Sequence, residues 1–168
     1  MNMRADLIIV GAGMVGSTLA LARDWLGEPL GIEVPVWQRD PQGIYFGGNN
    51  MLLSPRALLR FGELYRNGGV ADGRRILSED WIRASWTPQA RSVHTGDSYG
   101  YGWFISRIGG RPVRYGWGYG GQMIYVFPPT GRRPAVAIAM TSDPDQPSAR
   151  TGYRNDLHML ADRIVQTL

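Results

Sequence analysis

The sequence contains no lysine, so all 18 of its lysine-or-arginine positions are arginine. Without a lysine ammonium, the chain cannot form a Schiff base with a carbonyl substrate, a serine–lysine catalytic pair or a phosphate-binding P-loop. The arginines are spread among acidic residues, and the net charge at pH 7 is only +4. Because no basic block is present, we expect no nucleic acid partner.

Cysteine is also absent, which excludes disulfides, thiolate catalysis and cysteine-ligated metal sites. The two histidines, His94 and His158, do not have a metal-ligand spacing, so we expect no metal site. His158 is expected to be a surface or boundary residue. No apolar run reaches the length of a membrane span. The sequence leaves localisation open, with the cytoplasm slightly favoured over the periplasm or secretion.

The length of 168 residues suits one domain with a substantial core. Aromatic-rich extended runs alternate with turn signals such as Gly109-Gly110 throughout Tyr99–Ser142, and this pattern predicts a meander of three antiparallel strands. Within the same region, the apolar run Ala135–Thr141 is typical of a buried strand. One further N-terminal strand, Asp6–Val10, is possible. The fold class expected is therefore α+β, with an antiparallel sheet flanked by helices.

Helix start and stop signals predict three helices around these strands. Ser54-Pro55 combines an N-cap serine with proline at the first helical position, before an apolar stripe. Ser78 is a second N-cap and opens a short helix that reaches Trp86. The C-terminal residues Tyr153–Leu168 predict an amphipathic helix. Its apolar side is expected to consist of Leu157, Leu160, Ile164 and Leu168.

The chain divides into an N-terminal segment of uncertain origin, residues 1–23, and a main domain, residues 24–168. In the first segment a short apolar strand precedes the sequence GAGMVG, where Gly11, Gly13 and Gly16 fit the GxGxxG turn of a dinucleotide-binding site. This segment resembles the N-terminus of FAD-dependent aromatic and ubiquinone-pathway hydroxylases. The resemblance makes FAD an alternative cofactor.

Three interpretations of the N-terminal segment stay open. A dinucleotide site requires an acidic residue about 20 residues after the glycines. Gln38 stands where that acid is expected, and Glu33 begins the following extended run rather than ending it. A secretory signal that ends at Ala20-Leu21-Ala22 is the second interpretation. The third is a strand and a helix that pack on the rest of the chain.

Five segments of the main domain stand in a characteristic order. They are Trp25–Ile32 (WLGEPLGI), Asp40–Gly69, Gly73–Ile82 (GRRILSEDWI), Tyr99–Phe104 (YGYGWF) and Gly116–Pro128 (GWGYGGQMIYVFP). Together they resemble the C-terminal part of the serine β-lactamase and penicillin-binding-protein-like hydrolases, which include the class C β-lactamases. The resemblance implies a partial β-lactamase/transpeptidase-like domain in which the terminal helix packs on the sheet.

The resemblance also implies a substrate-binding strand. In the family, a strand with a Lys/His-Thr-Gly type motif lines the cleft beside the oxyanion donor. The matching positions here carry neither lysine nor histidine, and His94-Thr95-Gly96, which spells the motif literally, lies in an earlier loop. The candidate substrate-binding residues are Tyr115, Trp117, Gly118, Tyr119, Gly120, Gly121 and Gln122.

The leading hypothesis is a truncated or chimeric β-lactamase-related serine hydrolase that lacks its nucleophile and is inactive by itself. The family's catalytic serine lies three residues before a lysine, and a lysine-free chain cannot contain that pair. We assign no catalytic residue and no cofactor, and expect a small-molecule ester or amide ligand. One alternative is an FAD- or dinucleotide-binding remnant of a flavin-dependent monooxygenase. The other is a non-enzymatic interaction module that self-associates through an uncovered sheet edge.

Overall fold

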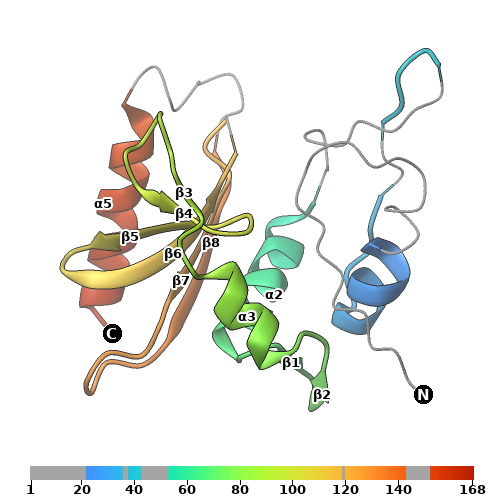
Figure 1. The fold of residues 1–168 in the computed structure, drawn as a ribbon, viewed down its shortest axis with the longest axis horizontal. Coiled ribbons are helices and arrows are strands. Elements are labelled where there is room, and N and C mark those ends of the chain that lie inside the picture. The colour runs from blue at the N-terminus through green and yellow to red at the C-terminus, as the bar shows by residue number, and fades with distance from the viewer. Residues whose placement is uncertain (1–21, 36–37, 43–52, 119, 143–151) are drawn as a thin grey trace.

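The computed structural model describes residues 22–35, 38–42, 53–118, 120–142 and 152–168, and its centre is an antiparallel sheet (Figure 1). Six strands follow one another across this sheet in chain order. They are β3 (Ala90–Arg91), β4 (Ser98–Tyr99), β5 (Phe104–Ile108), β6 (Arg111–Trp117), β7 (Met123–Phe127) and β8 (Val136–Met140). A separate two-stranded sheet pairs β1 (Val70–Ala71) with β2 (Arg74–Arg75).

The β5–β6 hairpin lies in the middle of the large sheet. Its two-residue turn, Gly109-Gly110, has φ angles of 55° and 78°, which belong to the left-handed region that glycine adopts without strain. The ladder then runs from the pair Ile108–Arg111 to the pair Phe104–Tyr115. The reversal predicted at the two glycines is confirmed.

Helices lie on both faces of the sheet, and serine caps begin two of them. The Ser54 hydroxyl accepts a hydrogen bond from the Ala57 N–H at 3.2 Å. The Ser78 hydroxyl accepts one from the Trp81 N–H at 3.0 Å. Each cap satisfies a backbone donor that has no partner within the helix. The helical elements are η1 (Ala22–Gly27), η2 (Glu28–Leu30), α2 (Pro55–Arg66), α3 (Glu79–Ser85) and α5 (Tyr153–Gln166).

The terminal helix α5 covers one face of the sheet (Figure 1). Leu157, Ala161 and Val165 follow at intervals of four residues, so they share one side of the helix and are all buried. They pack against Val113 and Tyr115 of β6. Of the residues predicted for the apolar side of this helix, Leu157 is buried and the other three are not. The three exposed side chains are Leu160, Ile164 and Leu168.

The opposite face of the sheet packs against α2, α3 and η2. Leu64 and Tyr65 of α2 meet Trp103 and Val126 in a second buried cluster, which Leu30 of η2 completes. The rings of Tyr65 and Trp103 lie 4.6 Å apart at an angle of 56°. The sheet is therefore the middle layer of three, with an independent apolar core on each side.

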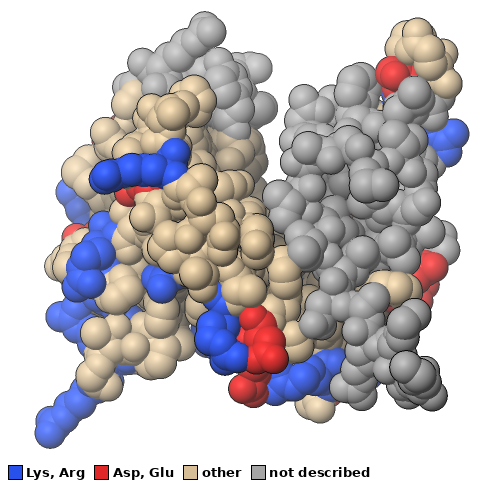
Figure 2. All heavy atoms as spheres, viewed as in Figure 1, with Lys and Arg blue, Asp and Glu red and all other residues tan. Residues whose placement is uncertain are grey.

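The predicted α+β fold is confirmed, although the sheet has six strands rather than three. The additional strands include β3 and β4, two residues each, which are too short to produce a pattern of alternating hydrophobicity. The possible strand Asp6–Val10 lies outside the described residues. Of the helices in the described part of the chain, none combines the length and hydrophobicity needed to cross a bilayer. Basic side chains occupy several separate places on the face shown in Figure 2.

One glycine sets the distance between α2 and the sheet. A Cβ at Gly62 would lie 3.0 Å from the Ile124 Cγ2 and 3.5 Å from the Ala137 Cβ. The first distance is shorter than an ordinary van der Waals contact, so α2 rests on β7 and β8 through the backbone of Gly62.

We therefore expect Gly62→Val to lower the free energy of unfolding by about 1–3 kcal/mol, because the added methyl groups overpack this contact. Denaturant unfolding of the purified protein measures the change. Arg66→Val is the matched control, since Arg66 is an exposed residue of the same helix. An equal loss of stability in both variants would show that valine is disfavoured in α2 wherever it is placed.

Candidate functional site

The predicted binding residues lie on β6 and on the turn that follows it. The Gly118 N–H donates to the Gln122 carbonyl at 2.8 Å, and the Gly121 N–H donates to the Gly118 carbonyl at 2.9 Å. These bonds close a tight turn between β6 and β7. Tyr119 lies outside the described residues, so its place in the turn stays a prediction.

Ser142, two residues after the end of β8, forms hydrogen bonds with this turn. Its hydroxyl lies 2.7 Å from the Gly120 carbonyl and 2.9 Å from the Gly121 carbonyl, to which it donates. Gly121 has a φ of 80°, and a Cβ there would lie 2.3 Å from the Ser142 oxygen and 3.1 Å from Leu157. Glycine is thus required at this position by the backbone and by the close approach of two neighbours.

Strand β6 continues past its neighbour β5 beside this turn. The β5–β6 ladder ends at the pair Phe104–Tyr115. The β6–β7 ladder continues further, through Gly116 to Trp117. In the described sheet these two residues pair with β7. Because Gly118 bonds to Gln122 and the bonding direction alternates along a strand, the N–H and C=O of Gly116 bond to β7, and those of Trp117 point away from β7.

The two aromatic residues predicted for this site have different environments. Tyr115 is completely buried, and its ring stacks on Phe104 at 4.8 Å. Trp117 is half-buried at the margin of the α5 core, where the Arg154 guanidinium lies 5.4 Å from its ring centre. Of the two side chains, Trp117 is the more exposed.

Tyr115 belongs to a polar network beneath α5. Its hydroxyl donates to the Asp97 carboxylate at 2.6 Å and accepts from Arg154 at 3.1 Å. The Ser106 hydroxyl donates to the other Asp97 oxygen at 2.7 Å. Burial raises the pKa of Tyr115, and the hydrogen bond to Asp97 raises it further. The phenol is therefore a neutral donor at physiological pH.

His158 of α5 lies beside this network. Its Nδ1 is 3.0 Å from the hydroxyl of Tyr125, and its ring packs edge-on against Tyr115 at 4.9 Å. Burial lowers the pKa of His158 to about 4, and the positive charge of Arg154 contributes in the same direction. The sequence prediction of a boundary position is confirmed. The hydrogen bond to Tyr125 was not predicted, because it joins residues 33 positions apart.

The other histidine is exposed. His94 lies in the loop between β3 and β4, where the Ser92 hydroxyl accepts from its backbone N–H at 3.3 Å. This confirms that His94-Thr95-Gly96 is a loop. Among the described residues, no group of three or more His, Cys, Asp or Glu side chains has the arrangement of a metal site. A pocket opens on the same part of the sheet as this loop. It is lined by the β3–β4 hairpin, β5 and β6, and not by the predicted turn.

The sequence was then compared with known families. The profile of the β-lactamase family matches residues 13–161. The chain belongs to the β-lactamase family. The match confirms the resemblance seen in the five segments of the main domain, and it begins within the N-terminal segment. The comparisons give no support to a relationship with FAD-dependent hydroxylases.

The chain is also similar to solved structures of bacterial proteins. A candidate 6-aminohexanoate-dimer hydrolase from Bacillus anthracis has a TM-score of 0.57 and 17% sequence identity over 79% of this chain and 34% of its own. A candidate β-lactamase from Bacteroides dorei DSM 17855 has a TM-score of 0.48 and 16% identity over 73% of this chain and 44% of its own. This chain thus spans about a third to less than half of the length of these proteins. A search of curated proteins gave no significant match.

The pKa of His158 leads to a prediction about stability. A histidine in an unfolded chain has a pKa of about 6.5, above the value of about 4 in the fold. As the pH falls between these values, the unfolded state binds the proton first, so the free energy of unfolding decreases. Above the unfolded pKa this contribution is fully retained.

His158→Gln should abolish this part of the pH dependence, because glutamine does not titrate. Denaturant unfolding over that pH window compares the two slopes, and NMR titration of the His158 ring measures the pKa directly. A ring that titrates at the unfolded value, or equal slopes in the two proteins, would contradict the prediction.

Proposed function

We propose that this chain provides the ligand-facing wall of a β-lactamase-related serine hydrolase and does not hydrolyse substrates by itself. The observation that carries the proposal is that β6 continues past β5 to Trp117, beside the turn that leads into β7, in a chain of the β-lactamase family. In this proposal an ester or amide ligand lies against the end of β6. The Trp117 side chain provides an adjacent apolar surface.

The hydrogen bonds of the serine side chains support the proposal that the chain does not hydrolyse substrates by itself. Acyl transfer requires a nucleophile whose hydroxyl donates to a base. In the described structure, Ser85 donates to the Ile82 carbonyl and Ser142 to the turn carbonyls. Ser106 donates to Asp97, but that carboxylate also accepts from Tyr115 and lies near Arg154. These hydroxyls have structural roles, and the sequence contains no lysine that could activate another serine.

The proposed function uses no cofactor. Gly11, Gly13 and Gly16, the residues of the alternative FAD site, lie outside the described residues. Two of them fall within the range that matches the β-lactamase family. We therefore do not propose a flavin-dependent function. A truncated or chimeric origin would account for a chain that covers a part of its structural neighbours.

Purified protein should be colourless and should give no turnover of a chromogenic cephalosporin or a nitrophenyl ester, and its mass should stay unchanged after incubation. The cephalosporin should nevertheless shift the backbone amide NMR signals of Gly116 and Trp117. Trp117→Ala should weaken this binding, whereas Trp25→Ala, at an exposed tryptophan of η1, should not. Turnover that a single serine substitution abolishes would overturn the claim of inactivity.

An interaction role is a second candidate, and the position of β8 favours it. In the described part of the sheet β8 is the terminal strand, paired with β7 alone. Its residues Val136–Met140 have no charged side chain, and an uncharged edge strand is a template for pairing with another chain. We propose self-association through this edge as the alternative to ligand binding.

Sedimentation velocity tests this alternative with the full chain. Self-association through β8 should give a dimer whose fraction rises with concentration, and amide hydrogen exchange of Val136–Met140 should slow in parallel. A monomer at every concentration would exclude this role. A dimer in which β8 exchange does not change would place the interface elsewhere and would equally reject the β8 edge.

A further inference from the structure

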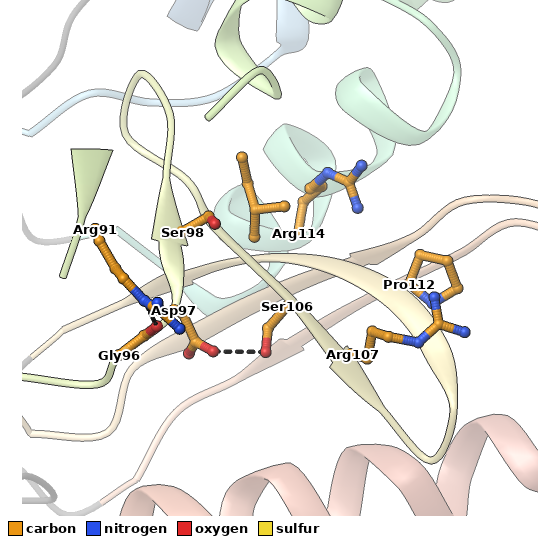
Figure 3. A pocket seen from close by; sticks show the side chains of 9 residues that line it. Arg91, Gly96, Asp97, Ser98, Ser106, Arg107, Pro112 and Arg114 are labelled. Carbon is orange, nitrogen blue, oxygen red and sulfur yellow. Dashed lines mark hydrogen bonds between the residues drawn. The ribbon is translucent and has the colours of Figure 1, made fainter. Parts of the chain in front are cut away.

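A pocket of about 610 Å³ opens where the β3–β4 hairpin leaves the sheet (Figure 3). The β4–β5 ladder has two residue pairs and stops at Ser98–Ile105. The β5–β6 ladder continues to Ile108–Arg111. The second half of β5 therefore has a strand on one side and the pocket on the other.

The register of the hairpin directs backbone groups of β5 into this pocket. In a hairpin with a two-residue turn, the closing pair exchanges both of its hydrogen bonds, and the bonding direction then alternates along each strand. Ile108 and Ser106 thus bond to β6, whereas the N–H and C=O of Arg107 face the pocket. Pro112, opposite Arg107, fits this assignment because proline has no N–H to give across the ladder.

Three arginines from three strands line the pocket, and none of them forms an ion pair with an acidic side chain among the described residues. Figure 3 shows Arg91 of β3 near Asp97 on one side, with Arg107 of β5 and Arg114 of β6 on the other. Arg91 donates to the Gly96 carbonyl through Nε, which leaves both of its terminal nitrogens without a described partner. One terminal nitrogen of Arg107 donates a hydrogen bond to the Gly110 carbonyl.

The single acidic residue of the pocket does not compensate these charges. One Asp97 oxygen accepts from Ser106, and the other accepts from Tyr115. The Arg154 guanidinium of α5 lies 3.8 Å from the same carboxylate. Asp97 is therefore neutralised from the α5 side of the sheet. The pocket retains the charge of its arginines.

Arg114 is the least satisfied of the three. Its Nε is buried and has no hydrogen-bond partner among the described residues. Its terminal Nη1 has one weak contact, with the Val113 carbonyl at 3.4 Å. Its guanidinium lies 5.5 Å from the ring centre of Trp86. Burial lowers the pKa of Arg114, because the charged guanidinium is partly removed from water.

We propose that this pocket binds a small ligand through an oxyanion, either a carboxylate or a phosphate group. Guanidinium groups pair with both anions through two parallel hydrogen bonds, and the free N–H of Arg107 adds a backbone donor. The site is separate from the end of β6 at Gly116 and Trp117. It is built from the opposite end of the β5–β6 hairpin.

Titration of the full chain with glutarate, inorganic phosphate and neutral glutaramide tests the site by calorimetry and by NMR of the Ser106 and Arg107 amides. Glutarate or phosphate should bind saturably, and glutaramide should not. Arg107→Gln should weaken the binding about tenfold, a loss of about 1.4 kcal/mol. Arg66→Gln, which removes an exposed arginine from α2, should leave it unchanged.

Binding of glutarate alone would identify a carboxylate ligand, and binding of phosphate alone would identify a phosphate ligand; either result supports the site. Arg91→Gln provides a second test from another strand if Arg107→Gln does not fold. The proposal is overturned by an equal loss of affinity in Arg66→Gln, by equal binding of glutaramide, or by the absence of saturable binding. None of these readouts depends on hydrolysis or on the end of β6.

Discussion

The hydrogen bond between Tyr115 and Asp97 is the interaction on which the arrangement of this domain depends. It joins the loop before β4 to the centre of β6, and Arg154 extends the same contact to α5. Tyr115 is completely buried, so its hydroxyl requires a partner, and an unpaired phenol there would cost about 1–3 kcal/mol. One carboxylate thus holds two strands and a helix in register.

The same contact divides the hairpin into two chemically different ends. On one side of Tyr115, β6 continues past β5 to Gly116 and Trp117. On the other, β5 continues past β4 and borders a pocket in which Arg114 has no anionic partner. Both openings arise because neighbouring strands differ in length. A sheet with strands of equal length would have covered both edges.

The sequence was a good guide where the determining chemistry is local. Serine before the first helical turn predicts α2 and α3, since a cap needs contacts within three residues. The pair Gly109-Gly110 predicts the central hairpin through its backbone freedom alone. The helix α5 was also predicted, but its buried side was not. Helical spacing allows more than one stripe, and in the fold Ala161 is buried whereas the neighbouring Leu160 is exposed.

The sequence by itself determined the family, the order of the elements and the lack of a serine–lysine pair, because each depends on residue identity and order. Only the tertiary structure decided that Tyr115 is interior and Trp117 is accessible. It also brought Asp97 to Arg154 and left Arg114 without such a partner. These outcomes depend on burial and on contacts between residues far apart in the chain, where the energy of a charge is set by the groups folded around it.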